Sequence, residues 1–142
     1  MGTWDTGPFD NDMAADWCGD LDHVEPGERV GVIRQALHAA AEQDGYLDSD
    51  EACPAIAAAA IVASRLPGGD PIDVTYGPEF LLEDPAIELP PDLAPLAVRA
   101  LDRVMAGESE WRSLWEGAFD GDRDAAFESV RRLRTVLSGS VG

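Results

Sequence analysis

Residues 49–65 read SDEACPAIAAAAIVASR, and this stretch decides what kind of fold the chain can form. Six alanines lie in Ala52–Ala60, and alanine combines the highest helix propensity with a small side chain. Asp48 and Glu51 have the spacing of a capping box at its start, and Leu66–Gly69 (LPGG) ends it. The stretch therefore predicts a slim helix that neighbouring elements can approach closely.

Five other stretches carry apolar residues at helical spacing, and in residues 11–21 these residues fall at i, i+3, i+4 and i+7, one face of a helix. The expected helices cover residues 11–21, 27–43, 49–65, 92–106, 109–117 and 122–137. The clearest inward face belongs to the helix at 92–106, and its members are Leu93, Leu96, Ala97, Ala100, Leu101 and Val104. Asp92 and Asp122 are the expected N-caps of the fourth and last helices, because a side-chain oxygen can accept from free N–H groups there.

These elements predict an all-α fold, a single helical domain over residues 1–142 built as an irregular bundle of about six helices. Residues 67–91 hold six prolines and predict an irregular, Pro-rich central loop. Residues 138–142 predict a frayed tail. The longest apolar run, 55–63, is too short to cross a bilayer. The first twelve residues contain neither Lys nor Arg, so we expect no secretory signal and a cytoplasmic protein without a membrane segment.

Charge is the strongest global signal in the sequence. The formal net charge is −18, from 28 acidic and 10 basic residues, and every basic residue is arginine. Residues 1–28 contain eight acids and no base. Such a field repels phosphate backbones, which argues against nucleic-acid binding, and it favours basic partners or cations as well as solubility. A chain without lysine but rich in Ala, Gly, Asp and Arg is typical of a GC-rich bacterial genome.

The N-terminal segment carries a motif of glycines, aromatic residues and aspartates. Its residues are Gly2, Trp4, Gly7, Pro8, Phe9, Asp10, Asp12, Asp16 and Trp17. The segment resembles the start of a bacterial family, domain of unknown function 4259, with Asp5 where the family pattern has a glycine after Trp4. Residues 109–116 are similar to the C-terminal part of that family. The resemblance implies no activity. Physically, we expect the segment to pack on the helices, because Trp4 and Phe9 bury large apolar area and glycines allow tight turns.

Four N-terminal carboxylates are weak candidates for binding a hard cation: Asp5, Asp10, Asp12 and Asp16. Their spacing defines no ligand set, and capping and solvation account for the same residues, so we expect no metal. Residues 120–124 (DGDRD) resemble the start of a calcium loop. Ala125 and Arg131 stand at the sixth and twelfth positions, where such a loop needs Gly and Glu, so a helix cap is the favoured interpretation.

The sequence shows no catalytic residue and no cofactor-binding motif. It has no nucleophile elbow, phosphate loop or dinucleotide fingerprint, and His23 and His38 lack zinc-binding spacing. Cys18 is expected in the core. Cys53 lies in the first turn of a helix, where the dipole could lower the pKa of a thiol, although a structural thiol is the favoured interpretation. An enzyme would need the fold to bring aspartate, His38 and Cys53 together.

We therefore expect an acidic module that binds another protein rather than an enzyme. One version is an immunity- or antitoxin-like protein that neutralises a basic toxin, since complementary charge speeds association. Trp111 and Trp115 lie one turn apart and are either core residues or, if exposed, anchors for the partner. A small hydrolase-like enzyme and a divalent-cation-dependent module using the N-terminal aspartates remain the alternatives.

Overall fold

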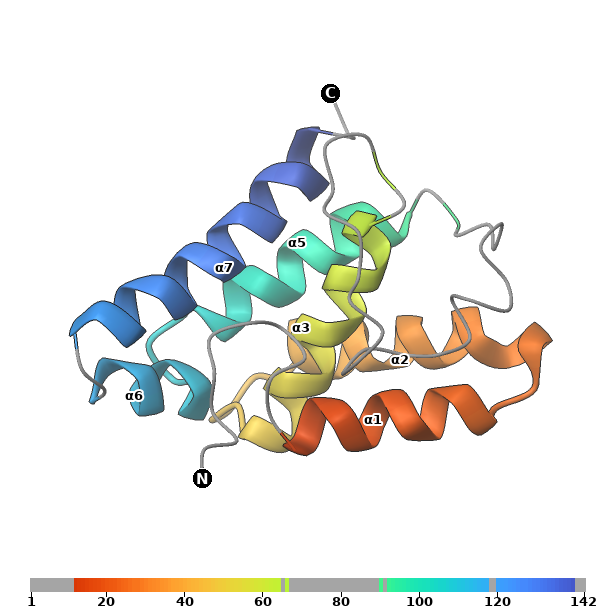
Figure 1. The fold of residues 1–142 in the computed structure, drawn as a ribbon, viewed down its shortest axis with the longest axis horizontal. Helices are drawn as coiled ribbons and strands as arrows, with labels where there is room; N and C mark the ends of the chain where they lie inside the picture. The colour runs from red at the N-terminus through yellow and green to blue at the C-terminus, as the bar shows by residue number, and fades with distance from the viewer. Residues whose placement is uncertain (1–11, 65, 67–89, 91, 118–119, 140–142) are drawn as a thin grey trace.

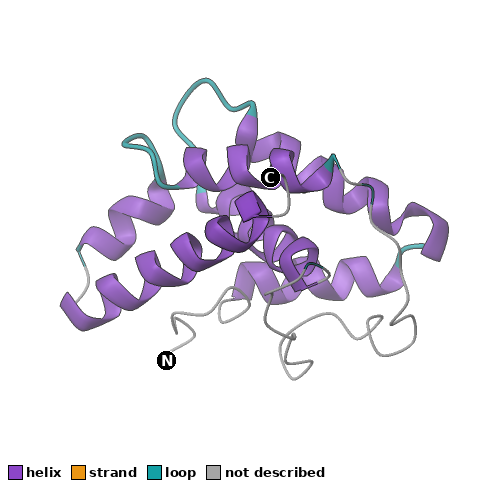
Figure 2. Ribbon diagram, turned by 90° about the horizontal axis from the view of Figure 1, so that it is seen from above, coloured by secondary structure: helices purple, strands orange, loops and turns teal. Residues whose placement is uncertain are grey.

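The structure, a computed structural model, describes residues 12–64, 66, 90, 92–117 and 120–139. This part of the chain contains six α-helices, one 3-10 turn and no β-strand. The elements are α1 (Asp12–His23), η1 (Pro26–Glu28, the 3-10 turn), α2 (Arg29–Ala41), α3 (Ser49–Ser64), α5 (Leu93–Val104), α6 (Glu110–Glu116) and α7 (Asp120–Gly139). The expected all-α bundle is confirmed (Figure 1, Figure 2).

Several helix ends differ from the expected ones by two residues: α1 ends later, α2 begins later and ends earlier, α5 ends earlier, and α7 begins earlier and ends later. The chain makes the 3-10 turn η1 before α2 begins at Arg29, because a glycine follows the initial proline and favours no helix. In α7 the helix already includes Asp120, so Asp122 lies inside the first turn and the prediction of an N-cap at Asp122 was wrong. Aspartates are favourable throughout a first turn, so they do not mark its start. At its other end α7 continues to Gly139, two residues beyond the expected end.

Three predicted segments lie outside the described residues. They are the N-terminal segment 1–11, the Pro-rich loop at 67–91 apart from Pro90, and residues 140–142 of the tail. The interpretations given for them remain predictions.

The alanine-rich helix α3 forms the centre of the bundle. Twelve of its sixteen residues are buried, among them Cys53, Ala57 and Ile61. It contacts each of the other five described α-helices (Figure 1). A helix that is apolar on all sides is stable only when other elements cover it, and its short alanine side chains let those elements approach closely. The sequence stretch that predicted a slim helix therefore supplies the axis of the fold.

The helices α2 and α5 run in the same direction along one side of α3. Arg34, in the middle of α2, bonds to Asp92 before α5, whereas Arg103, near the end of α5, bonds to residues that follow α2. All six residues predicted to face inward from α5 are buried. On α2, Ile33, Leu37 and Ala40 provide the matching buried face.

The helix α1 packs against α3 through the residues predicted for its inward face. Cys18 and Leu21 are buried, and Trp17 is partly buried against the core. In the described part of the chain, no helix is both long enough and apolar enough to span a membrane.

Candidate functional site

Three arginines bond to backbone carbonyl groups where helices end. Arg29 is 6% exposed and donates from Nε to the Leu21 oxygen (3.4 Å) and from Nη2 to the Asp22 oxygen (3.1 Å), both in the last turn of α1. The carbonyl groups of a last helical turn have no partner within the helix, and they carry the negative end of its dipole. A guanidinium group both donates hydrogen bonds to these carbonyl groups and carries a positive charge. Arg29, the first residue of α2, therefore caps the end of α1.

The same arrangement recurs after α2 and after α5. Arg103 donates from Nε to the Gln43 oxygen (3.0 Å) and from Nη2 to the Gly45 oxygen, beyond the end of α2. Arg112 donates from Nη1 to the oxygen of Met105, the residue that caps α5 (2.7 Å). Each of these arginines therefore binds the chain itself rather than presenting its whole guanidinium group to solvent.

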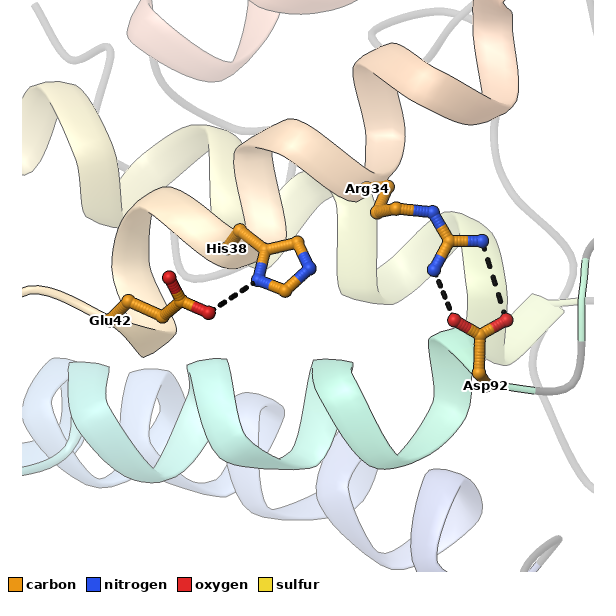
Figure 3. A network of polar contacts seen from close by, with 4 residues as sticks. All are labelled: Arg34, His38, Glu42 and Asp92. Carbon is orange, nitrogen blue, oxygen red and sulfur yellow. Dashed lines mark hydrogen bonds and ion pairs between the residues drawn. The ribbon is translucent and has the colours of Figure 1, made fainter.

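Other arginines form ion pairs between helices. Figure 3 shows Arg34 of α2 and Asp92, the residue before α5, facing each other, with both terminal guanidinium nitrogens bonded to the carboxylate. The hydrogen bonds from Arg34 hold the pKa of the Asp92 carboxyl below its ordinary value. Arg134 of α7 makes a similar pair with Asp102 of α5, at 2.6 Å from Nε to Oδ1. These pairs connect α5 to the helices on either side of it.

The Arg34 pair corrects one prediction about Asp92. This residue occupies the N-cap position of α5, but its side chain makes no capping hydrogen bond. The physical reason is competition, since a fork of two charge-assisted bonds to Arg34 is stronger than one bond to a neutral N–H group.

His38 lies beside this ion pair on α2. Its Nδ1 is 2.9 Å from the Glu42 carboxylate one turn later, and its side chain is 43% exposed (Figure 3). His38 is therefore a surface residue with a local partner, whereas Cys53 is 1% exposed. Burial, with the nearby Asp50 and Glu110 carboxylates, raises the pKa of the Cys53 thiol to about 12. The idea that the helix dipole lowers the pKa of the Cys53 thiol was wrong, because burial raises it.

Cys18 is also a structural thiol. It is buried in the core, and burial followed by the charge of Asp22 raises its pKa to about 12. Both cysteines are free. At neutral pH each thiol therefore stays protonated, as favoured from the sequence.

The loop between α2 and α3 is fixed to the start of α6. The Leu47 N–H donates to the Glu108 oxygen (2.9 Å), and the Glu110 N–H donates to the Leu47 oxygen (2.8 Å). The Ser49 N–H donates to Glu110 Oε1 (2.7 Å), and this bond holds the pKa of the Glu110 carboxyl below its ordinary value. The Leu47 side chain is fully buried. These bonds join segments about sixty residues apart along the chain.

Gln43 holds the other end of this loop. Its side-chain nitrogen donates to Glu51 Oε1 (3.1 Å), its side-chain oxygen accepts from the Gly45 N–H (3.0 Å), and its carbonyl oxygen accepts from Arg103. The Glu51 carboxylate therefore bonds to Gln43, and not back to the start of α3 as the predicted capping box requires. The loop is held at both ends by bonds that converge from α3, α5 and α6.

Tyr46 stands at the exposed side of this braced loop. Its exposed fraction is 50%, and in the described part of the chain only Tyr46 and Leu114 are large apolar residues with such exposure. Four exposed carboxylates accompany Tyr46 in the loop, at the start of α3 and across the backbone bridge: Asp44, Asp48, Asp50 and Glu108. We call these five residues the Tyr46 surface. Tyr46 was not among the residues predicted from the sequence, where its loop looks like an ordinary polar loop. The hydrogen bonds that fix this loop come from residues far away along the chain.

The predicted interaction candidates differ in what the structure shows. Trp111 is 5% exposed, with its ring centroid 5.8 Å from that of Phe127 in α7, which favours the core interpretation. The backbone of Trp115 is helical in α6, and its side chain lies outside the described residues. Of the two aromatic residues Tyr46 and Trp111, Tyr46 is exposed to solvent and Trp111 is not.

Most residues of the N-terminal motif lie outside the described residues. These are Gly2, Trp4, Gly7, Pro8, Phe9 and Asp10, and the metal candidate Asp5 lies outside the described residues too. Asp12 begins α1, Asp16 is exposed on it, and Trp17 packs against the core. Among the residues that the structure describes, no group of three or more His, Cys, Asp or Glu side chains is arranged to hold a metal ion. The weak metal candidates therefore remain untested as a set.

Comparison with known proteins identifies the family of the chain. The model of the family described as domain of unknown function (DUF4259) matches residues 2–126, which include the N-terminal motif and every described helix from α1 to α6. No curated protein and no solved structure matches the chain. Because the match covers most of the 142 residues, the chain belongs to the family of domain of unknown function 4259.

Proposed function

We propose that this protein is a cytoplasmic binding module for a basic protein partner. The observation that supports the proposal is that arginines bond to groups of the chain itself while acidic residues are in large excess. Arg29, Arg103 and Arg112 donate to the chain's own carbonyl groups, and Arg34 and Arg134 are paired with carboxylates of α5 or its N-cap. Five of the ten basic residues are therefore bonded within the chain itself, and the acidic residues outnumber the basic ones by 28 to 10.

A large net negative charge affects how fast the protein associates with a partner. A surface field of one sign attracts a partner of the opposite sign over distances near the Debye length, about 8 Å at physiological salt, and can raise association rates by factors of about 10 to 1,000. The same field opposes phosphate backbones, so a protein partner fits better than a nucleic acid. An immunity- or antitoxin-like protein that neutralises a basic toxin is the specific version we favour, because fast association matters most for such a protein.

A pull-down from the native host, read by mass spectrometry, tests the proposal. The bait is the full chain, and the control bait is an unrelated protein of equal size and net charge. We expect one basic protein enriched over the control, and the purified pair should associate more slowly as salt is raised. If both baits recover the same generic basic proteins, the proposed function is refuted.

A further inference from the structure

We propose that the Tyr46 surface receives an arginine-bearing segment of the basic partner, with a guanidinium group over the Tyr46 ring and its charge met by the surrounding carboxylates. This inference rests on the proposed function and adds the location and the chemistry of the contact. Three properties of the described residues support it: a half-exposed ring, a rigid support and a local excess of acid.

The ring is available, and its support is rigid. Tyr46 is 50% exposed, while its neighbour Leu47 is fully buried and bonded through its own N–H and C=O groups to Glu108 and Glu110. Gly45, on the other side of Tyr46, is bonded to Arg103 and Gln43. An aromatic residue fixed by its neighbours loses little conformational entropy when a partner covers it, and aromatic residues of this kind are enriched among interface hot spots.

Charge complementarity determines the kind of occupant. Asp44, Asp48 and Asp50 are exposed and lie within four residues of Tyr46 along the chain, and the exposed Glu108 accepts a backbone hydrogen bond from Leu47, the residue after Tyr46. Arg103 bonds to the Gln43 and Gly45 carbonyl groups of this loop, and its single positive charge leaves the four carboxylates in excess. An apolar or acidic partner segment would bury these carboxylates without compensation, whereas a basic segment supplies the missing charge.

Arginine fits this surface better than lysine does. Its planar guanidinium group can stack on a tyrosine ring and still present donors to carboxylates at its edge, whereas an ammonium group is a compact and strongly hydrated point charge. The chain contains a cation–ring arrangement of this type within α7, where the Arg131 guanidinium lies 5.9 Å from the centroid of the Phe127 ring. The surface should therefore distinguish two peptides of equal charge.

The test uses two labelled probe peptides of the same length, a glycine–arginine repeat and a glycine–lysine repeat, titrated with the full chain by fluorescence anisotropy. We expect the arginine peptide to bind more tightly. Tyr46→Ala should weaken binding of the arginine peptide about three- to tenfold and that of the lysine peptide less than about twofold. Tyr46→Phe keeps the ring and should bind like the wild type, and Leu114→Ala controls for removing the other exposed apolar side chain.

Two variants with the same change in net charge locate the contact. The first neutralises the carboxylates of the Tyr46 surface and carries Asp44→Asn, Asp48→Asn, Asp50→Asn and Glu108→Gln. The second neutralises four exposed carboxylates on other elements and carries Asp16→Asn, Asp20→Asn, Glu28→Gln and Glu128→Gln. We expect the first to weaken binding of the arginine peptide about tenfold and the second about twofold or less.

Each outcome decides the inference. Equal losses in the two charge variants, or equal affinity for the two peptides, would show that only total charge matters and would overturn the Tyr46 surface while leaving the proposed function in place. Absence of binding by either peptide would also overturn it. The proposed function itself fails only on the pull-down with the matched control bait, so the two failures are distinguishable.

Discussion

Replacing Arg29 by methionine tests whether the arginines that close helix ends stabilise the fold. The substitution keeps an apolar stem of similar length in a site that is 6% exposed, and it removes the guanidinium group. The carbonyl oxygens of Leu21 and Asp22 each lose a charged donor, at 3.4 and 3.1 Å. Hydrogen bonds to charged groups contribute about 1.5–3 kcal/mol each, and the longer bond contributes least.

Part of this loss is recovered, because burying a guanidinium group itself costs desolvation free energy. We therefore expect Arg29→Met to lower the free energy of unfolding by about 2–3 kcal/mol, which corresponds to a fall in Tm of roughly 6–12 °C for a chain of this size. Arg29→Lys keeps the charge but lacks the fork that bonds two carbonyl groups, so we expect about half of that loss.

Urea unfolding followed by circular dichroism, with thermal scans in parallel, provides the measurement. The matched control is Arg134→Met, which removes an ion pair whose side chains are about half exposed, 48% for Arg134 and 54% for Asp102. Exposed pairs contribute about 0–1 kcal/mol, so the control should remain close to the wild type. If Arg29→Met unfolds within about 0.5 kcal/mol of the wild type, the argument that these arginines support helix ends is wrong.

Three further predictions follow from burial and charge. Both thiols, Cys18 and Cys53, should resist a disulfide reagent at pH 8 in the folded protein and react fully in denaturant, because their pKa values are raised to about 12; fast labelling of the native chain would contradict their burial. Asp92 has a lowered pKa in the folded state, so its contribution to stability is present above the pKa of the unfolded chain and lost as the pH falls through the folded pKa; Asp92→Asn should flatten that acid limb in unfolding measurements, and an unchanged limb would argue against the ion pair. Ala57→Leu should destabilise by about 1–3 kcal/mol through overpacking of the fully buried centre of α3, whereas Ala39→Leu on the exposed side of α2 should stay within about 0.5 kcal/mol in the same assay; equal effects would contradict the central position of α3.

Helical periodicity predicted the bundle well, because the spacing that places apolar residues on one face of a helix also determines which residues pack in the core. In α5, the six residues placed on the inward face by spacing alone are all buried. The alanine-rich stretch predicted α3 to within one residue at its end, since alanine favours the helix and its small side chain favours a central position. Local propensity and tertiary packing agree in these elements, so the sequence is sufficient there.

Predictions failed where a distant side chain competes with a local pattern. Asp92 and Glu51 have the positions and chemistry of helix caps, yet the structure bonds them to Arg34 and Gln43. No local spacing rule contains these partners, because they come from another element. Arg29 shows the same limit, since a charged residue next to a helical stripe reads as exposed although it is buried.

The Tyr46 surface could not be predicted for a related reason. Its bracing depends on backbone bonds from Leu47 to Glu108 and Glu110, and backbone groups are the same in every residue. The sequence shows only a polar loop with an acidic cluster. The half-exposed ring becomes meaningful once the loop is known to be rigid, because an ordered exposed aromatic residue and a mobile one differ in what they lose on binding.

The hydrogen bonds from arginines to carbonyl groups give a structural reason why the chain uses arginine and no lysine. Lysine presents one compact charge, whereas arginine presents a planar fork that can reach two carbonyl oxygens at once, as Arg29 and Arg103 do. Arg29 closes the end of α1, and Arg103 holds the loop that follows α2, which in both cases takes a fork rather than a point charge. Arginines used in this way connect the helices. Arg29→Met should therefore weaken the end of α1 while it makes the net charge more negative by one unit, so stability and association with the partner respond in opposite directions.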